Sequence, residues 1–171
     1  ADVYLSRSLK KKELVSLRNG LYVPGGFSEK HRTDDRYLFM LANILRTPSY
    51  VTSWTALQYY GLATESINTI ISATTRVTRG YETRLGSFSF HSILPRLFTD
   101  FVLKSGDFPF FIASPAKALF DLLYFKTKQM KGVELSEIPA LLVELRIDIE
   151  DMDEQEKIRF FNLLKEFKSH G

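Results

Sequence analysis

The sequence predicts an α+β fold: a partial winged helix, consisting of one helix and a hairpin, followed by a mixed α/β domain with a small sheet and C-terminal helices. Three observations support this. An Asn19-Gly20 pair separates two short apolar runs, the middle of the chain contains β-branched and aromatic runs, and segments with helical spacing close it. The 171 residues are 44% apolar, enough for one sizeable core.

The first helix is expected over residues 2–12, with Asp2 as its N-cap. Leu5 and Leu9 lie one turn apart and form its apolar side. The other side is basic and carries Tyr4, Arg7, Lys10 and Lys11. Because a hairpin follows at once, this helix is expected to be short and to present its basic side to the surroundings.

The hairpin is the clearest local prediction. The Asn-Gly pair suits a two-residue type I′ turn, in which both central residues have positive φ. In that register Leu17 faces Tyr22 on the core side, while Ser16 and Arg18 point outward. The polar stretch from Pro24 to residue 33 is then expected to be a connector, which divides the chain into a module over residues 1–30 and a domain over residues 31–171.

The second domain is expected to begin with two helices. The first covers residues 34–46, with Leu38, Leu41 and Leu45 as a buried stripe. A second helix is expected to begin at a Thr52 or Ser53 cap and to end at Gly61, a natural C-terminal glycine.

Strands are expected in the middle of the chain, over residues 67–75, 87–94 and 108–113. An arginine-rich link joins the first two strands and contains Arg76, Arg79 and Arg84, which we note as a secondary basic surface. Ser114 and Pro115 then open a helix that extends to Phe125. Two acidic-flanked helices, over residues 136–146 and 153–167, complete the chain.

Charge is unevenly distributed along the chain. Residues 1–104 contain 14 Lys and Arg against 8 Asp and Glu, whereas residues 105–171 contain 9 against 12. The chain has no cysteine, its three histidines lack metal-ligand spacing, and no glycine-rich phosphate loop occurs, so we expect no metal site and no cofactor. No apolar run approaches the ~18–20 residues of a membrane span, and we expect a soluble cytoplasmic protein.

A helix with a basic face followed by a hairpin matches the last half of a winged helix, in which the helix enters the major groove of double-stranded DNA. The expected DNA contacts are Tyr4, Arg7, Lys10, Lys11, Lys12 and Arg18. The alternative is a solvated lysine run beside a surface hairpin. A complete winged helix has two earlier helices and none precedes Ala1, so either an N-terminal segment is missing or the module is not a winged helix.

Two other features admit a functional interpretation. The last helix has an apolar stripe of Phe160, Leu163, Leu164 and Phe167, which we expect to be core. The alternative is a contact with a partner or a second copy through Phe160, Leu163 and Phe167. Ser114 and Lys117 match the S-x-x-K pattern of serine acyl-transfer enzymes, but the companion motifs are absent. A surface ion pair between Lys117 and Asp121 is the favoured interpretation, and we expect no enzyme.

Three blocks, in this order, resemble the AbiEi family, the antitoxin and transcriptional-regulator half of type IV toxin-antitoxin operons. The blocks are YLSRSLKKKELVSLRNGLYV, YVTSWTALQYYGL and FIASPAKALFDLLYF, and they span about two thirds of the chain. The matching positions are Arg18, Gly20, Tyr22, Ser53, Ala56, Leu57, Gly61, Leu62, Ser114, Pro115, Lys117, Ala118, Leu119 and Asp121. Asn19 and Ala116 depart from the pattern, at positions where basic and acidic residues are common.

The resemblance implies a repressor that binds DNA upstream of its own operon and, through its second domain, counteracts a co-encoded nucleotidyltransferase-type toxin. The residues themselves do not identify the toxin. A protein-binding module that acts through the C-terminal helix without binding DNA is the alternative function.

Overall fold

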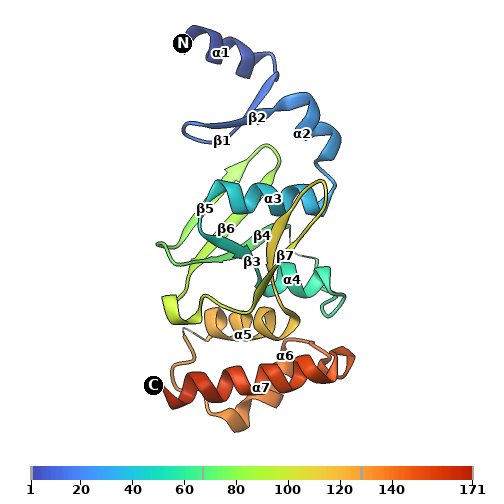
Figure 1. The fold of residues 1–171 in the computed structure, drawn as a ribbon, viewed down its shortest axis with the longest axis vertical. Helices are drawn as coiled ribbons and strands as arrows, with labels where there is room; N and C mark the ends of the chain where they lie inside the picture. Colours follow the sequence, from blue (N-terminus) through green and yellow to red (C-terminus); the bar gives the residue numbers. More distant parts are fainter. Residues whose placement is uncertain (1, 67, 128, 171) are drawn as a thin grey trace.

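The computed structural model describes residues 2–66, 68–127 and 129–170, and confirms the α+β class. Within these residues seven α-helices accompany a two-stranded hairpin and a six-stranded mixed sheet. The molecule is elongated, and its N-terminal, middle and C-terminal parts lie one after another along the long axis (Figure 1). The hairpin and first helix lie at one end, the sheet and α3 in the middle, and α5, α6 and α7 at the other end.

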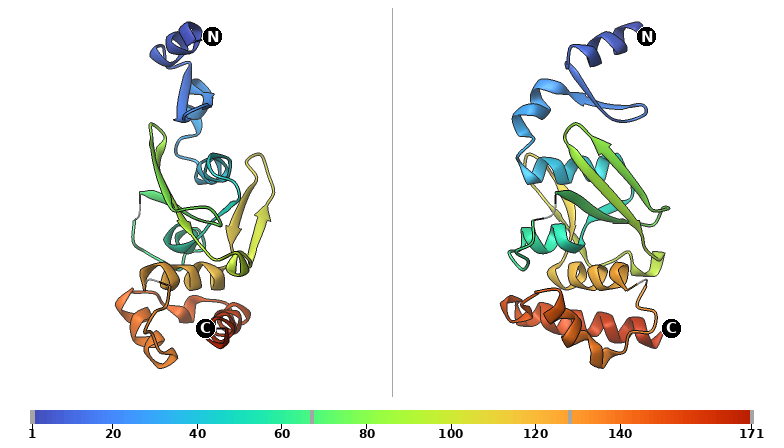
Figure 2. Two further views of the ribbon diagram at one scale, coloured as in Figure 1. Left: turned by 90° about the vertical axis from the view of Figure 1, so that its left-hand side faces the viewer. Right: turned by 180° about the vertical axis from the view of Figure 1, so that it is seen from behind.

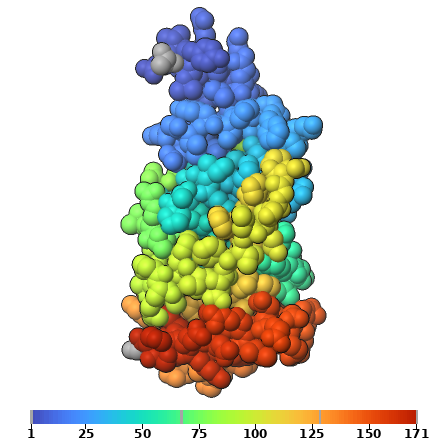
Figure 3. All heavy atoms as spheres, in the orientation of Figure 1, coloured from blue at the N-terminus to red at the C-terminus, as the bar shows by residue number. Residues whose placement is uncertain are grey.

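The N-terminal part contains α1 (Asp2–Lys10), β1 (Leu14–Arg18), β2 (Leu21–Pro24) and α2 (Gly25–His31). Helix α1 projects beyond the rest of the molecule, as both views of Figure 2 show, and forms its narrow end in Figure 3. In this helix only Ser8 is buried. The hairpin, by contrast, buries side chains in the same continuous core as α3 and the sheet.

The predicted hairpin forms, but its predicted register is wrong. Ser16 pairs with Tyr22, and a bulge follows before Arg18 pairs with Leu21, so Leu17 does not face Tyr22. Of the turn pair, only the glycine has a positive φ, at 79°, whereas a type I′ turn needs two. A glycine of positive φ next to a bulge is typical of a three-residue hairpin loop, which is one residue longer than the predicted type I′ turn. Ser16 and Arg18 are exposed, as predicted.

The predicted connector after β2 is instead the helix α2, which crosses residue 30. The Gly-Gly pair lies at the start of this helix and does not end the regular structure. Gly25 allows the backbone of α2 to approach the backbone of Lys12 closely. A Cβ atom at Gly25 would lie 2.0 Å from the carbonyl oxygen of Lys12. The amide of Gly25 also donates to the carbonyl of Glu13 at 2.8 Å. Further along α2, a buried hydrogen bond of 2.7 Å between the hydroxyls of Ser28 and Tyr37 joins α2 to α3.

The two predicted helices that follow are confirmed as α3 (Asp35–Leu45) and α4 (Ser53–Tyr59). The side chain of Asp34 caps α3 by accepting from the amide of Arg36. After α4, Gly61 has a φ of 74°, and the next amide returns to the carbonyl of Leu57 at 2.8 Å, as in a Schellman motif. The short strand β3 (Ser49–Val51), between these helices, was not predicted.

The six-stranded sheet has the order β5-β6-β4-β3-β8-β7. Strand β3 pairs antiparallel with β4 and parallel with β8, β4 pairs parallel with β6, and the two edge strands are antiparallel to their neighbours. The remaining bounds are β4 (Thr69–Thr74), β5 (Arg79–Thr83), β6 (Gly86–Ser92), β7 (Phe101–Lys104) and β8 (Phe110–Ala113). The three predicted strands are therefore confirmed as β4, β6 and β8, although position 67 of the first lies outside the described residues.

Helices complete the fold at the C-terminal end. Helix α5 (Pro115–Lys126) lies between the sheet and α7 (Glu154–Ser169), and α6 (Ile138–Glu144) lies beside α7 (Figure 1). These helices confirm the predicted C-terminal segments. Short 3₁₀ turns occur at Pro95–Leu97, Leu135–Glu137 and Ile149–Asp151.

We predict that Gly25→Ala destabilises the protein by about 1–3 kcal/mol, because the added methyl group overpacks the contact with the Lys12 carbonyl. Gly26→Ala is the matched control, since nothing lies within 4 Å of the position that its methyl group would take and alanine favours a helix. Urea unfolding of both variants tests this. Equal stability of the two variants would contradict the close approach.

Candidate nucleic-acid interface

Helix α1 and the two residues after it present five of the six predicted DNA contacts on an exposed surface. Tyr4 is 75% exposed, and Arg7 and Lys10 line one shallow hollow on the helix. Lys11 and Lys12 are also exposed, and the amide of Lys11 extends the helical turn by donating to the carbonyl of Arg7 at 2.9 Å. Within the described residues none of these cations forms an ion pair with a carboxylate. Their charge is therefore directed at the solvent.

The sixth predicted contact, Arg18, has a different environment. Its Nε donates to the carbonyl of Leu45 at the end of α3, at 3.1 Å, and its Nη1 donates to the carbonyl of Asn19 at 3.2 Å. The structure brings Arg18 together with Arg76 and Arg79, which line the same cavity of about 490 Å³. The hairpin and the arginine-rich link, which are far apart in the sequence, thus share one basic site.

Sequence reasoning missed one member of this cavity, Arg46. It follows α3, and only 5% of it is exposed. Its Nη2 donates to the carbonyl of Val77 at 2.8 Å, and its Nη1 donates to the hydroxyl of Tyr81 at 3.3 Å. The sequence places Arg46 at the end of a predicted helix. It does not indicate that Arg46 is buried, because strand β5, which packs beside it, was not predicted. Arg84, the third arginine of the link, lies near the β5–β6 turn and is not among the residues that line the cavity.

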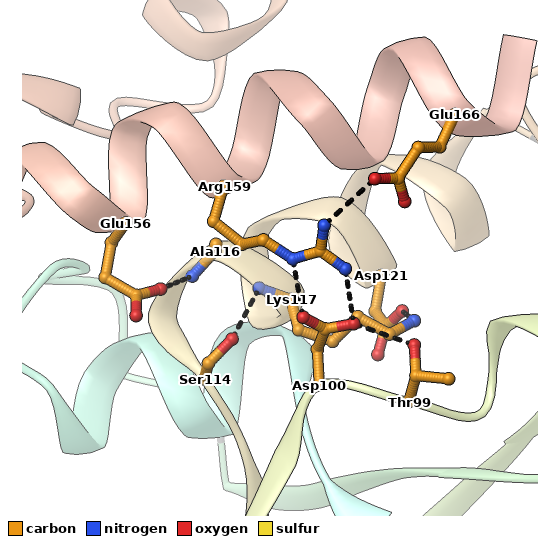
Figure 4. A network of polar contacts seen from close by, with 9 residues as sticks. All are labelled: Thr99, Asp100, Ser114, Ala116, Lys117, Asp121, Glu156, Arg159 and Glu166. Atoms are coloured by element: carbon orange, nitrogen blue, oxygen red, sulfur yellow. Dashed lines mark hydrogen bonds and ion pairs between the residues drawn. The ribbon is translucent and has the colours of Figure 1, made fainter.

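The S-x-x-K segment is part of the helix start. The hydroxyl of Ser114 accepts from the backbone amide of Lys117 at 3.2 Å, the ordinary N-cap geometry (Figure 4). The Lys117 ammonium instead donates to Oδ1 of Asp121 at 2.6 Å. The predicted pair therefore forms, but its predicted surface position is wrong, because both residues are 0% exposed. This geometry gives the segment a structural role.

Asp121 is a carboxylate held in the core by several donors. Its Oδ2 accepts from the hydroxyls of Tyr50 and Thr52, at 2.8 and 2.7 Å. Burial raises the pKa of Asp121, and the Lys117 ammonium and the hydroxyl donors oppose that rise. Burial also raises the pKa of Tyr50 well above its ordinary value, with the neighbouring carboxylate adding to the effect. These hydroxyls join the end of strand β3 to α5.

A second set of polar contacts joins α7 to the start of α5 and to Asp100 (Figure 4). Arg159 forms a two-pronged ion pair with Asp100, at 2.7 and 2.9 Å, and lowers the pKa of that carboxyl. Glu156 accepts from the backbone amide of Ala116 at 2.8 Å. A carboxylate at this helix start matches the sign of the helix dipole. It comes from α7 and not from α5 itself.

The apolar stripe of α7 belongs to the core. Phe160 and Leu163 are 0% and 6% exposed, and Phe167 packs its ring against Phe120 and Tyr124. The first interpretation of this stripe, as core, is therefore confirmed for Phe160 and Leu163, whose side chains are covered within this chain.

Metal-ligating side chains do not gather in the part of the chain that the structure describes. Over residues 2–66, 68–127 and 129–170, no three His, Cys, Asp or Glu side chains are grouped as they would be to hold a metal ion. In that same part of the chain, every helix is too short or too polar to cross a membrane.

Comparison with protein-family models, curated proteins and solved structures finds no match for this chain. The resemblance to the AbiEi family therefore stays a prediction from the sequence blocks.

We predict that Asp121→Asn destabilises the protein by about 3–5 kcal/mol, because it leaves the Lys117 ammonium buried without a counter-charge. The double variant Lys117→Met with Asp121→Asn is expected to recover most of this loss, since it removes the charge and retains an acceptor for Tyr50 and Thr52. Urea unfolding at neutral pH measures both.

The control for this experiment is Glu150→Gln, which breaks an exposed ion pair with Lys157. That change is expected to cost at most about 1 kcal/mol. If Asp121→Asn proved no more harmful than Glu150→Gln, the buried pair would not hold the fold together.

Proposed function

We propose that this protein is a cytoplasmic, DNA-binding transcriptional autorepressor that also acts as an antitoxin against a co-encoded nucleotidyltransferase-type toxin. In this proposal α1 is the recognition helix of a winged helix and the β1–β2 hairpin is its wing. The target is double-stranded DNA in the promoter of its own operon. The antitoxin part of the proposal rests on the sequence resemblance alone.

The observation that carries the DNA-binding part is the unpaired basic surface of α1. The helix stands out from the body of the molecule, and its cations make no ion pair within the described part of the chain. Arg and Lys side chains on a projecting helix are suited to contact phosphates and base edges. The hairpin that follows directly has the order of a recognition helix and its wing.

The test is salt-dependent binding to duplex DNA from the region upstream of the gene. We expect Lys10→Ala with Lys11→Ala to weaken binding and to reduce the slope of log affinity against log salt by about 2, roughly one unit for each phosphate that is no longer neutralised. Fluorescence anisotropy over a range of salt concentrations measures both quantities.

The control is Lys131→Ala with Lys165→Ala, which removes two exposed lysines from the C-terminal part and changes net charge equally. Its affinity and slope are expected to equal those of the unaltered protein. An identical response of the two double variants would show that only net charge matters, and would remove α1 from the interface.

The antitoxin role is tested by co-expression with the product of an adjacent nucleotidyltransferase gene. We expect growth to be restored by the unaltered protein and by the Lys10→Ala, Lys11→Ala variant, because neutralisation is assigned to the second domain. Repression of a reporter driven by the upstream promoter should fail in that variant. Failure of the unaltered protein to restore growth would refute the antitoxin role and leave the DNA-binding test unaffected.

A further inference from the structure

We propose that the cavity between the hairpin, the end of α3 and strand β5 is a binding site for a phosphate-class anion, held by Arg18, Arg46, Arg76 and Arg79. This inference does not rest on the proposed function, because the cavity is separate from α1 and shares only Arg18 of the hairpin with the predicted DNA contacts. The phosphate could belong to a small phosphate ester or to a nucleic-acid backbone, and the experiment below distinguishes these sources.

The first argument is the charge of the lining. Besides the four arginines, the described residues that line the cavity are all uncharged: Asn19, Ile44, Leu45, Thr47 and Tyr81. None of the four guanidinium groups forms an ion pair within the described residues. Four like charges in one hollow repel one another, and a bound anion would relieve this repulsion.

The second argument is the state of Arg46. Burial of a charged group is costly unless a counter-charge and hydrogen bonds compensate it. Only 5% of Arg46 is exposed, yet both of its side-chain hydrogen bonds go to neutral oxygens. Its Nε is buried and has no hydrogen-bond partner among the described residues. The charge of Arg46 is therefore buried without a carboxylate partner in the part of the chain that the structure describes, and an anion in the cavity that Arg46 lines would supply the missing counter-charge.

A structural alternative is that the arginines only satisfy the free carbonyls at the end of α3, where cations are favourable. This explains Arg18, which donates to the carbonyl of Leu45. It does not explain Arg76 and Arg79, whose guanidinium groups form no hydrogen bond in the described part of the chain. The Arg79 group lies against the ring of Tyr81, 5.1 Å from its centroid. These two residues keep their donors available.

Size and donor geometry favour phosphate over a small monovalent anion. The cavity volume of about 490 Å³ falls in the range of sites for small organic ligands. The planar fork of arginine matches two oxygens of a phosphate, and a phosphate monoester carries nearly two negative charges at neutral pH. Several arginines together are therefore best matched by a multiply charged oxyanion.

The experiment titrates the full chain with inorganic phosphate and with a nucleoside monophosphate by isothermal calorimetry, and with duplex DNA by anisotropy. Because Arg46 is buried and its replacement risks unfolding, the test variant is Arg76→Gln with Arg79→Gln, both exposed. The control is Arg32→Gln with Arg36→Gln, two exposed arginines outside the cavity that remove the same charge. Circular dichroism verifies that both variants are folded.

We expect the test variant to lose at least tenfold in affinity for a phosphate-bearing ligand, while the control stays within twofold. If the small phosphates bind saturably and show this loss, the site takes a free phosphate ester. If only DNA binding shows it, the site takes a backbone phosphate. Equal behaviour of the test and control variants toward every ligand, or no binding of any of them, would overturn the proposal.

Discussion

The carboxylate of Asp121 is the interaction on which the main domain depends. Its two oxygens hold an ammonium group from its own helix and two hydroxyls from the end of β3, all within 2.8 Å. A charge pair in the core is costly unless further hydrogen bonds support it, and here the hydroxyls of Tyr50 and Thr52 donate two more to the carboxylate. Because β3 lies inside the sheet, this group ties α5 to the strands, while Arg159 and Glu156 tie α7 to the same region.

The sequence predicted the elements whose local chemistry is strong. Helices α3, α4 and α5 have a cap, a terminal glycine or an N-terminal proline, and β4, β6 and β8 are β-branched or aromatic runs. The strands that were missed, β3, β5 and β7, are three to five residues long and depend on their neighbours for pairing. Helix α2 was missed because Gly25 resembles a chain break, although its lack of a side chain serves a tertiary contact.

The candidate site was predictable only in part, for a similar reason. The basic face of α1 follows from helical spacing alone, so its members could be named from sequence. The arginine cavity instead gathers residues from a hairpin, a helix end and a strand, at positions 18, 46, 76 and 79. No local pattern links these positions. The burial of Phe160 was expected, but the element that covers it could not be named from the sequence, because a wide apolar stripe has the same appearance whether α5 or another protein covers it.

The bonds of Asp121 also have a consequence for synthesis on the ribosome. Tyr50 and Thr52 precede their partner by 71 and 69 residues, and strand β8, which pairs with β3, also comes late in the chain. At about 5–20 residues per second, roughly 4–14 s pass before Asp121 emerges after them. During that interval one edge of β3 stays open beside apolar surface. The nascent chain therefore has a defined period in which a chaperone could bind it, and this period ends when α5 leaves the exit tunnel.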